Sequence, residues 1–174
     1  MASEKKVAYP IVHAAARREA PLPSPEGGRH DRRLPRRVHR DGQRTPWQDD
    51  IAAALAALPV TLWNPRRDAW DASWRQSVDE PLFREQVEWE LEAQERADVI
   101  AMYFAPETRA PITLLELGLF ARSGKLVVCC PEGYWRRGNV QVVCRRYGAR
   151  EVADLGALAQ AIAAAADGAT ERLP

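Results

Sequence analysis

One acidic residue, Glu116, lies in an apolar stretch where a carboxylate could have a chemical role. Its neighbours include leucines at positions 114, 115, 117 and 119. A carboxylate on an apolar helix face is costly to bury unless it is paired, and burial shifts its pKa. Such perturbed groups tend to mark active sites. The pattern leaves a second interpretation open, in which Glu116 lies at the helix rim and is solvated.

The elements around this acid form a strand–helix–strand unit. Residues 99–104 and 125–130 are short apolar runs, typical of buried parallel strands. A helix is predicted between them over residues 112–123, and Gly124 ends it. This unit predicts a parallel sheet, whose ligands bind at the carboxyl ends of the strands. The loop over residues 105–111 lies at that edge.

A second acid, Glu90, has a position that could complement Glu116. A helix is predicted over residues 81–97, with an inner stripe marked by Phe83, Val87, Leu91 and Gln94. Glu90 lies seven residues after the first and three after the second, on the same inner face. The alternative is an ordinary solvated position on the helix surface.

Several unusual sequence words surround these two acids in a fixed order. They are Trp47-Gln48, Asn64-Pro65-Arg66-Arg67-Asp68, Trp89-Glu90-Leu91, Pro111-Ile112, Leu114 to Leu119, Gly124-Lys125 and Gly138-Asn139-Val140. With this pattern, residues 46–153 resemble the nucleoside 2-deoxyribosyltransferase superfamily. In that superfamily the Glu of the Glu-Leu-Gly word is the nucleophile, so the resemblance implies that Glu116 is catalytic.

The resemblance implies a mechanism with two carboxylates. Glu116 would attack C1′ of a 2-deoxyribosyl group and form a covalent glycosyl-enzyme. The second carboxylate of the superfamily stands eight residues before the Asp that opens the next strand, which is Asp98 here, so this role falls to Glu90. Glu90 would protonate the departing base and then deprotonate the acceptor. A base as acceptor gives transfer, and water gives hydrolysis. No metal or redox cofactor is implied.

Candidate substrate-binding residues follow the predicted strands. Asn64, Arg67 and Asp68 come after a strand predicted over residues 60–63, at the rim of the expected ligand site. Turn chemistry with solvated charge is the alternative for this loop.

Two further positions could contact the substrate. Tyr103 or Phe104, at the end of a predicted strand, could contact the base or orient the nucleophile. Asn139 could be the N-cap of a helix over residues 140–147. In oligomers of the family, an Asn from this region reaches the sugar bound by the neighbouring subunit, which gives Asn139 a second possible role.

The chain departs from the family pattern in two places. The classical transferases of the superfamily have an Asp six residues before the nucleophile, where this chain has Ala110, so their handling of the base is not expected to carry over unchanged, although Pro111-Ile112 matches the closer branch. Members also carry a first strand and a small-residue loop where residues 37–44 are polar and basic. Read one base forward with suitable synonymous codons, these residues give Val-Phe-Ile-Ala-Thr-Gly-Ser. We hypothesise a frameshifted first strand, which an intact reading frame on resequencing would refute.

Residues 1–45 differ in composition from the rest of the chain. Residues 17–45 hold nine Arg and four acids, whereas the whole 174-residue chain has a net charge of +1. We expect this segment to be disordered apart from a short strand over residues 7–12, because it cannot bury a core. A basic arm for nucleic acid is the alternative. However, no aromatic residue between Tyr9 and Trp47 could stack on bases, so no nucleic-acid partner is expected.

Cysteine usage and hydropathy indicate the class of protein. The three cysteines lack metal-site spacing and are expected to be buried reduced thiols in a cytoplasmic protein. No apolar run approaches 18 residues, so no membrane span is expected. The start of the chain lacks an apolar signal core.

Residues 46–174 are therefore expected to form a flavodoxin-like three-layer α/β sandwich with a parallel sheet. About four strands follow residue 46, and the first strand is atypical or missing. The expected function is cleavage of a nucleoside or nucleotide N-glycosidic bond with 2-deoxyribosyl transfer. The alternative is a catalytically weak nucleotide-binding or interaction module, because the first-strand loop and the acid at position 110 are absent. The expected ligand is a nucleoside or nucleotide, and the resemblance favours a homo-oligomer.

Overall fold

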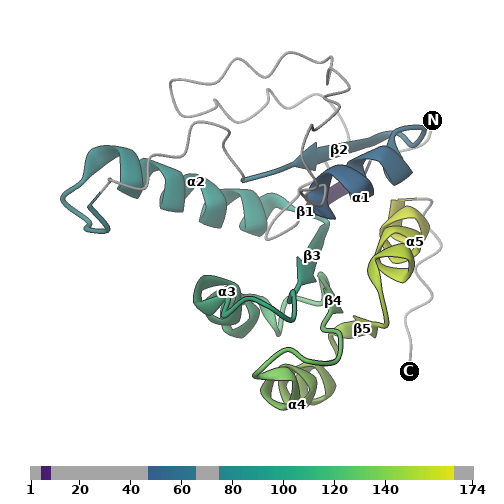
Figure 1. The fold of residues 1–174 in the computed structure, drawn as a ribbon. Helices are drawn as coiled ribbons and strands as arrows, with labels where there is room; N and C mark the ends of the chain where they lie inside the picture. Colours follow the sequence, from purple (N-terminus) through teal and green to yellow (C-terminus); the bar gives the residue numbers. More distant parts are fainter. Residues whose placement is uncertain (1–4, 9–46, 66–74, 167–174) are drawn as a thin grey trace, which may run out of the picture.

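The computed structural model describes residues 5–8, 47–65 and 75–166 (Figure 1). In chain order the elements are β1 (Lys5–Ala8), α1 (Trp47–Leu55), β2 (Val60–Trp63), α2 (Pro81–Arg96), β3 (Val99–Tyr103), α3 (Pro111–Phe120), β4 (Leu126–Cys129), α4 (Arg137–Tyr147), β5 (Arg150–Val152) and α5 (Leu155–Ala166). Arg67, Asp68 and residues 37–44 lie outside the described residues, so the predictions made for them stay predictions.

The five strands form one parallel sheet in the order β2-β1-β3-β4-β5. This is the flavodoxin-like strand order, and it confirms the expected fold class. Four strands follow residue 46, as predicted. All four residues of β4 are buried, which explains why this strand is a continuous apolar run. The direction of winding reverses between β1 and β3, and ligands of such sheets bind at the carboxyl ends of the strands on either side of this point.

The first strand is present, and it comes from the start of the chain. Residues Lys5–Ala8 pair with β2 along their whole length, from Lys5 opposite Val60 to Ala8 opposite Trp63. The same strand pairs with β3 through Val7 and Ala8. The first strand was expected to be either atypical or missing, and the structure shows that it is present but atypical. Residues 5–8 belong to the sheet, although they precede the Arg-rich segment.

Helices cover both faces of the sheet and complete the three layers. In Figure 1, α1 and α5 lie on one side of the strands, and α2, α3 and α4 lie on the other. The largest fully buried apolar side chains come from α1, β3, the residue after β3, and α5; they are Ile51, Leu55, Ile100, Met102, Phe104, Leu158 and Ile162. This core holds α2 and α3 on the same side of the sheet, where their acidic residues can meet.

One helix end has a capping side chain, and another corrects a predicted cap. Asp154 precedes α5, and its Oδ1 accepts a hydrogen bond from the backbone N–H of Ala157 at 2.8 Å, as a helix cap does. The prediction for Asn139 as a cap was wrong, because α4 begins at Arg137 and Asn139 lies inside the helix. Gly148 ends α4 with a φ of 71°, a conformation in which glycine has no steric penalty.

The cysteines are buried, as predicted. Cys129, Cys130 and Cys144 are all free thiols, and burial raises their pKa to about 12, 11 and 12. Thiols with such pKa values are unreactive near neutral pH. Within the residues described, no helix is both long and apolar enough to cross a membrane.

Candidate active site

The side chain of Glu116 is buried, which excludes a solvated position at the helix rim. It lies five residues after Pro111, the first residue of α3, and only 5% of it is exposed. The outer face of the same helix is apolar instead, with Ile112, Leu115 and Leu119 between 57% and 60% exposed. Leu117 of α3 is buried as well, so the helix is apolar on its inner and its outer side, unlike an ordinary surface helix whose outer side is polar.

A buried glutamine on the neighbouring helix holds the carboxyl group of Glu116. Gln94 of α2 has no exposed surface, and its Nε2 donates a hydrogen bond to Oε1 of Glu116 at 3.0 Å. The same nitrogen donates to the backbone carbonyl oxygen of Glu90 at 3.3 Å. Gln94 therefore connects the nucleophile candidate to the helix turn that carries the second acid.

A second glutamine holds Glu90 in a similar way. Gln86 is 2% exposed, and its Nε2 donates to Oε1 of Glu90 at 2.6 Å and to the backbone oxygen of Pro65 at 3.2 Å. Gln86, Glu90 and Gln94 follow one another at intervals of four residues, so they share one face of α2. Pro65 follows β2, so Gln86 also connects Glu90 to the carboxyl end of that strand.

This face corrects the inner stripe predicted for the helix. Val87 was predicted to point inward and is exposed, whereas Gln94 is buried and Glu90 is partly buried, as predicted. Hydropathy favoured an inward position for Val87, but the helix instead buries the side-chain amides of Gln86 and Gln94, which donate hydrogen bonds to the two acids.

The electrostatic environment favours the protonated form of Glu116. Its pKa is raised from 4.5 to about 8, first by burial and then by the negative charge of Glu90, while the hydrogen bond from Gln94 lowers it. Near neutral pH the free protein therefore keeps a proton on Glu116. The two acids titrate as a coupled pair, in which the charge of one affects the proton of the other.

Both glutamines have a cost in stability. Among the described residues, Oε1 of Gln86 and Oε1 of Gln94 are buried and have no hydrogen-bond partner. An unsatisfied buried acceptor costs about 1–3 kcal/mol, a cost that an apolar side chain would avoid. This cost occurs where both amide donors point at acidic residues, and local conflicts of this kind are expected at functional sites.

A family model described as nucleoside 2-deoxyribosyltransferase like matches residues 39–134, more than half of the chain. The chain belongs to this family. No curated protein matches the sequence. The matched range of this nucleoside 2-deoxyribosyltransferase-like protein includes Glu90, Glu116 and both glutamines.

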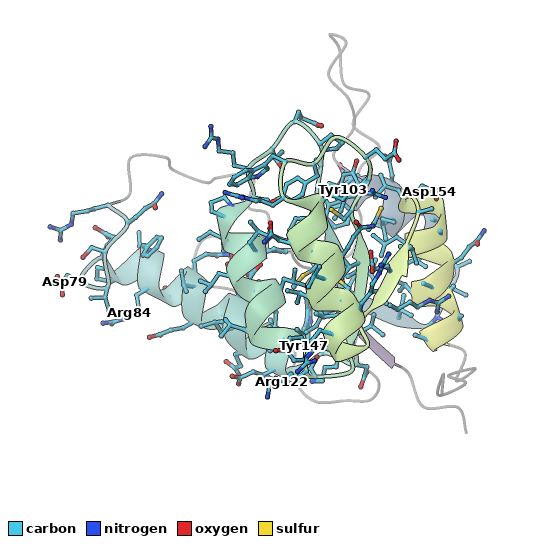
Figure 2. All side chains as sticks on the ribbon, turned by 90° about the horizontal axis from the view of Figure 1, so that it is seen from below. Asp79, Arg84, Tyr103, Arg122, Tyr147 and Asp154 are labelled. Atoms are coloured by element: carbon cyan, nitrogen blue, oxygen red, sulfur yellow. The ribbon has the colours of Figure 1, made fainter. Side chains whose placement is uncertain are left out.

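Of the other candidate residues in this family member, Tyr103 is near the carboxyl edge and Phe104 is in the core. Tyr103 ends β3 and is partly buried, with its ring centroid 5.5 Å from that of Trp47. Figure 2 shows Tyr103 at the opposite end of the described structure from Arg122 and Tyr147. Phe104 is fully buried and packs on Tyr134, so it offers no surface to a ligand.

The two asparagines occupy different surroundings. Asn64 is partly buried directly after β2, next to the Pro65 carbonyl that Gln86 binds. Asn139 is exposed on α4, beyond the residues that the family model matches. The roles of both asparagines in substrate binding stay predictions.

The loop before α3 holds its shape through two aromatic side chains. Tyr134 Oη and Trp135 Nε1 donate to the backbone oxygen of Arg109 at 2.8 and 3.1 Å. Ala110 follows in the left-handed region, with a φ of 41°. A cleft of about 380 Å³ lies against this loop and is lined by Pro106, Glu107, Thr108, Arg109 and Trp135. Neither acid of the pair lines this cleft.

The sequence contained a signal for the glutamines that its hydropathy did not reveal. Gln86 and Gln94 flank Glu90 at four residues on either side, the spacing at which helix side chains meet. Two amides at this spacing around an inward-facing acid would have predicted a polar stripe on α2. Their contacts also depend on how α2 is rotated against α3, which local sequence does not determine.

Proposed function

We propose that the protein cleaves the N-glycosidic bond of a 2-deoxynucleoside or its nucleotide and transfers the deoxyribosyl group to a base or to water. One observation carries this proposal, namely a buried carboxyl group, Glu116, that is hydrogen-bonded to Gln94 and electrostatically coupled to Glu90. Membership of the family supports the same chemistry. The proposed setting is a homo-oligomeric cytoplasmic enzyme.

The proposed reaction has two balanced halves. In the first, an oxygen of ionised Glu116 bonds to C1′ while the bond between C1′ and the base nitrogen breaks, and Glu90 gives its proton to the departing base. In the second, Glu90 takes a proton from the acceptor base or from water as that molecule bonds to C1′. The bond between C1′ and Glu116 then breaks, and the carboxylate is restored.

The coupled pair predicts how the rate depends on pH. Productive binding needs one proton on the pair, carried by Glu90, while the free protein keeps this proton mainly on Glu116. This productive form is a constant fraction of the protein molecules in which the pair carries one proton, so its population rises and falls with theirs. We therefore expect kcat/KM to decline above pH 8, where the pair loses its last proton, by about tenfold per pH unit.

Substrate contacts are proposed for the residues at the carboxyl edge of the sheet. Asn64, Arg67 and Asp68 follow β2, and Tyr103 ends β3 on the other side of β1. These strands flank the point where the winding reverses, where ligands of this fold bind. Asn139 is proposed to act from a neighbouring subunit.

Intact-mass spectrometry tests the covalent step. The protein is incubated with deoxynucleosides or their 5′-monophosphates, and released base is followed by chromatography. We expect a deoxyribosyl adduct with base release in the wild-type protein, and neither in Glu116→Gln. Glu90→Gln is expected to lower kcat/KM about 10²–10⁴-fold, the range for loss of a general acid.

A matched control uses another glutamate of α2. Glu88 is exposed and pairs with Arg84 on the helix surface, so Glu88→Gln should leave adduct formation unchanged. Absence of adduct and of base release from folded wild-type protein would contradict the proposed activity. Retained nucleotide binding under those conditions, unaffected by both Gln variants, would favour a nucleotide-binding module.

A further inference from the structure

We propose that Gln94 is a positioning residue for the reaction. Its side-chain amide fixes Oε1 of Glu116, favours the ionised carboxylate and leaves Oε2 to attack C1′. This inference rests on the function proposed above, but it concerns a residue that acts through the nucleophile without touching the substrate. The proposed role explains why the protein buries the Gln94 amide although the oxygen of that amide has no hydrogen-bond partner among the described residues.

The amide of Gln94 can face Glu116 in one orientation only. Its Nε2 donates to Oε1 of Glu116 at 3.0 Å and to the backbone oxygen of Glu90 at 3.3 Å. Rotating the amide by half a turn would place its oxygen against the backbone oxygen of Glu90, which has no proton to donate, and against the carboxylate oxygen of ionised Glu116. The backbone contact on its own helix therefore keeps the donor directed at the carboxyl group.

A fixed donor distinguishes between the two states of Glu116. A hydrogen bond to a carboxylate is stronger than one to a neutral carboxyl oxygen, so the donor stabilises the ionised form. Among the described residues, Glu90 is the charged group that acts on Glu116, and it acts in the opposite direction. Gln94 therefore offsets burial and the like charge, and makes the attacking form accessible.

The same contact orients the carboxyl group. The structure gives Glu116 one hydrogen bond within the described residues, at Oε1. Holding this oxygen restricts rotation about the last side-chain bond, and Oε2 is left as the oxygen that can bond to C1′. A nucleophile held in the attacking geometry gains rate through lower entropy loss.

If Gln94 served only to stabilise the fold, replacing it would lower the melting temperature, whereas a positioning role predicts no such loss. Gln94 is fully buried and its Oε1 has no partner in the described part of the chain. Methionine has a similar volume and no acceptor to satisfy, so Gln94→Met should melt at the same temperature as the wild type or higher. Loss of function without loss of stability would separate positioning from packing.

The test measures Glu116 directly in the full-length protein. Side-chain carboxyl carbons of glutamate are labelled with ¹³C, and the signal of Glu116 is assigned by its loss in Glu116→Gln. We expect the titration midpoint of Glu116 to rise by about one pH unit in Gln94→Met, because the donor is gone. With deoxynucleoside substrates, kcat/KM at pH 7 should fall at least tenfold, and the decline at high pH should move upward with the midpoint.

Gln86 provides the matched control on the same helix. It is equally buried and also donates to an acid, but to Glu90 instead of Glu116. Gln86→Met should therefore shift the Glu116 midpoint by less than Gln94→Met does. Gln94→Leu serves as a second variant if the methionine variant does not fold.

The outcomes separate this proposal from the proposed function. An unchanged Glu116 midpoint in folded Gln94→Met, or an equal shift in Gln86→Met, would overturn the role of Gln94 even if the wild-type protein is active. A raised midpoint together with no turnover in the wild type would overturn the proposed function instead, while the hold of Gln94 on Glu116 would stand.

Discussion

At the scale of single residues, two glutamates of the same chemical type have been given different surroundings. Glu116 is buried on α3 and meets one amide donor, whereas Glu90 is partly buried on α2 and meets Gln86. Pairs of acids whose environments differ in this way can divide the roles of nucleophile and acid. The sequence resemblance implies this division of roles, which stays a proposal.

The raised pKa of Glu116 predicts a measurable effect on stability. From pH 4.5 to about 8 the folded protein keeps a proton that the unfolded chain has released, so stability falls as pH rises through this window. The slope is at most about 1.4 kcal/mol per pH unit from this group. Glu116→Gln has no such proton to keep. Its free energy of unfolding, relative to that of the wild type, should therefore rise from pH 5 to 8 and then stay constant.

Urea denaturation at pH 5, 6.5, 8 and 9.5 would measure this difference. Glu88→Gln is the control, because that exposed side chain is solvated on α2. Parallel stability curves for the wild type and Glu116→Gln would show that Glu116 is not protonated in the folded protein at neutral pH.

At the scale of the elements, the loop between β3 and α3 places the nucleophile candidate by a strained turn. Ala110 has a φ of 41°, and α3 starts at the next residue. The contacts of Tyr134 and Trp135 with the Arg109 carbonyl hold the chain in this conformation. Strain of this kind persists where surrounding contacts over-determine it, often beside functional sites.

This strain predicts that Ala110→Gly stabilises the protein. A left-handed conformation costs a residue with a Cβ about 1–2 kcal/mol, whereas the added freedom of glycine in the unfolded chain costs about 0.4–1 kcal/mol. The strain is the larger effect, so a net gain of about 0.5–1 kcal/mol is expected in urea denaturation.

Gly148 supplies the reverse comparison for this prediction. It has a φ of 71° at the end of α4, and a Cβ there would meet no atom within 4 Å. Gly148→Ala should therefore destabilise the protein by about 0.5–1 kcal/mol through backbone strain alone. A loss of stability in both variants would show that Ala110 is not strained.

At the scale of the whole molecule, the outer face of α3 is an exposed apolar stripe formed by Ile112, Leu115 and Leu119. Val142 of the neighbouring α4 is also exposed, and the two helices are in contact. The single charged residue of α3, Glu116, points inward, so two copies of this face would meet without charge repulsion. A self-complementary neutral face favours pairing with a second copy of the chain.

Sedimentation velocity tests this assembly. We expect the wild type to sediment as a dimer or larger, and Leu115→Glu to sediment as a monomer, because it would place a charge in the buried face. Val78→Glu is the control, since Val78 is exposed in the loop before α2 and away from the stripe. A wild-type protein that stays monomeric at every concentration would rule this interface out.

Periodicity and end signals in the sequence predicted most of the fold after residue 46. Each element predicted there lies within about three residues of its observed position, because apolar runs and a helix stop such as Gly124 act locally. These elements are the strands predicted over residues 60–63, 99–104 and 125–130 and the helices predicted over residues 81–97, 112–123 and 140–147. The internal strand β1 was harder to predict: a strand was expected over residues 7–12, and β1 comprises Lys5–Ala8. Residues 5–8 pair with strands that begin at residues 60 and 99, and such long-range pairing leaves no periodic signal in a segment of four residues.

The sequence by itself determined the order of elements, the family and the two acids, because these depend on short words and their spacing. Only the tertiary structure decided that Glu116 is buried, that Leu115 and Leu119 of α3 are exposed, and that Gln86 and Gln94 donate to the acids. These features depend on how α2 and α3 are rotated about their own axes when they pack on the sheet. That rotation is set by the sum of contacts across the core, and no local pattern contains it.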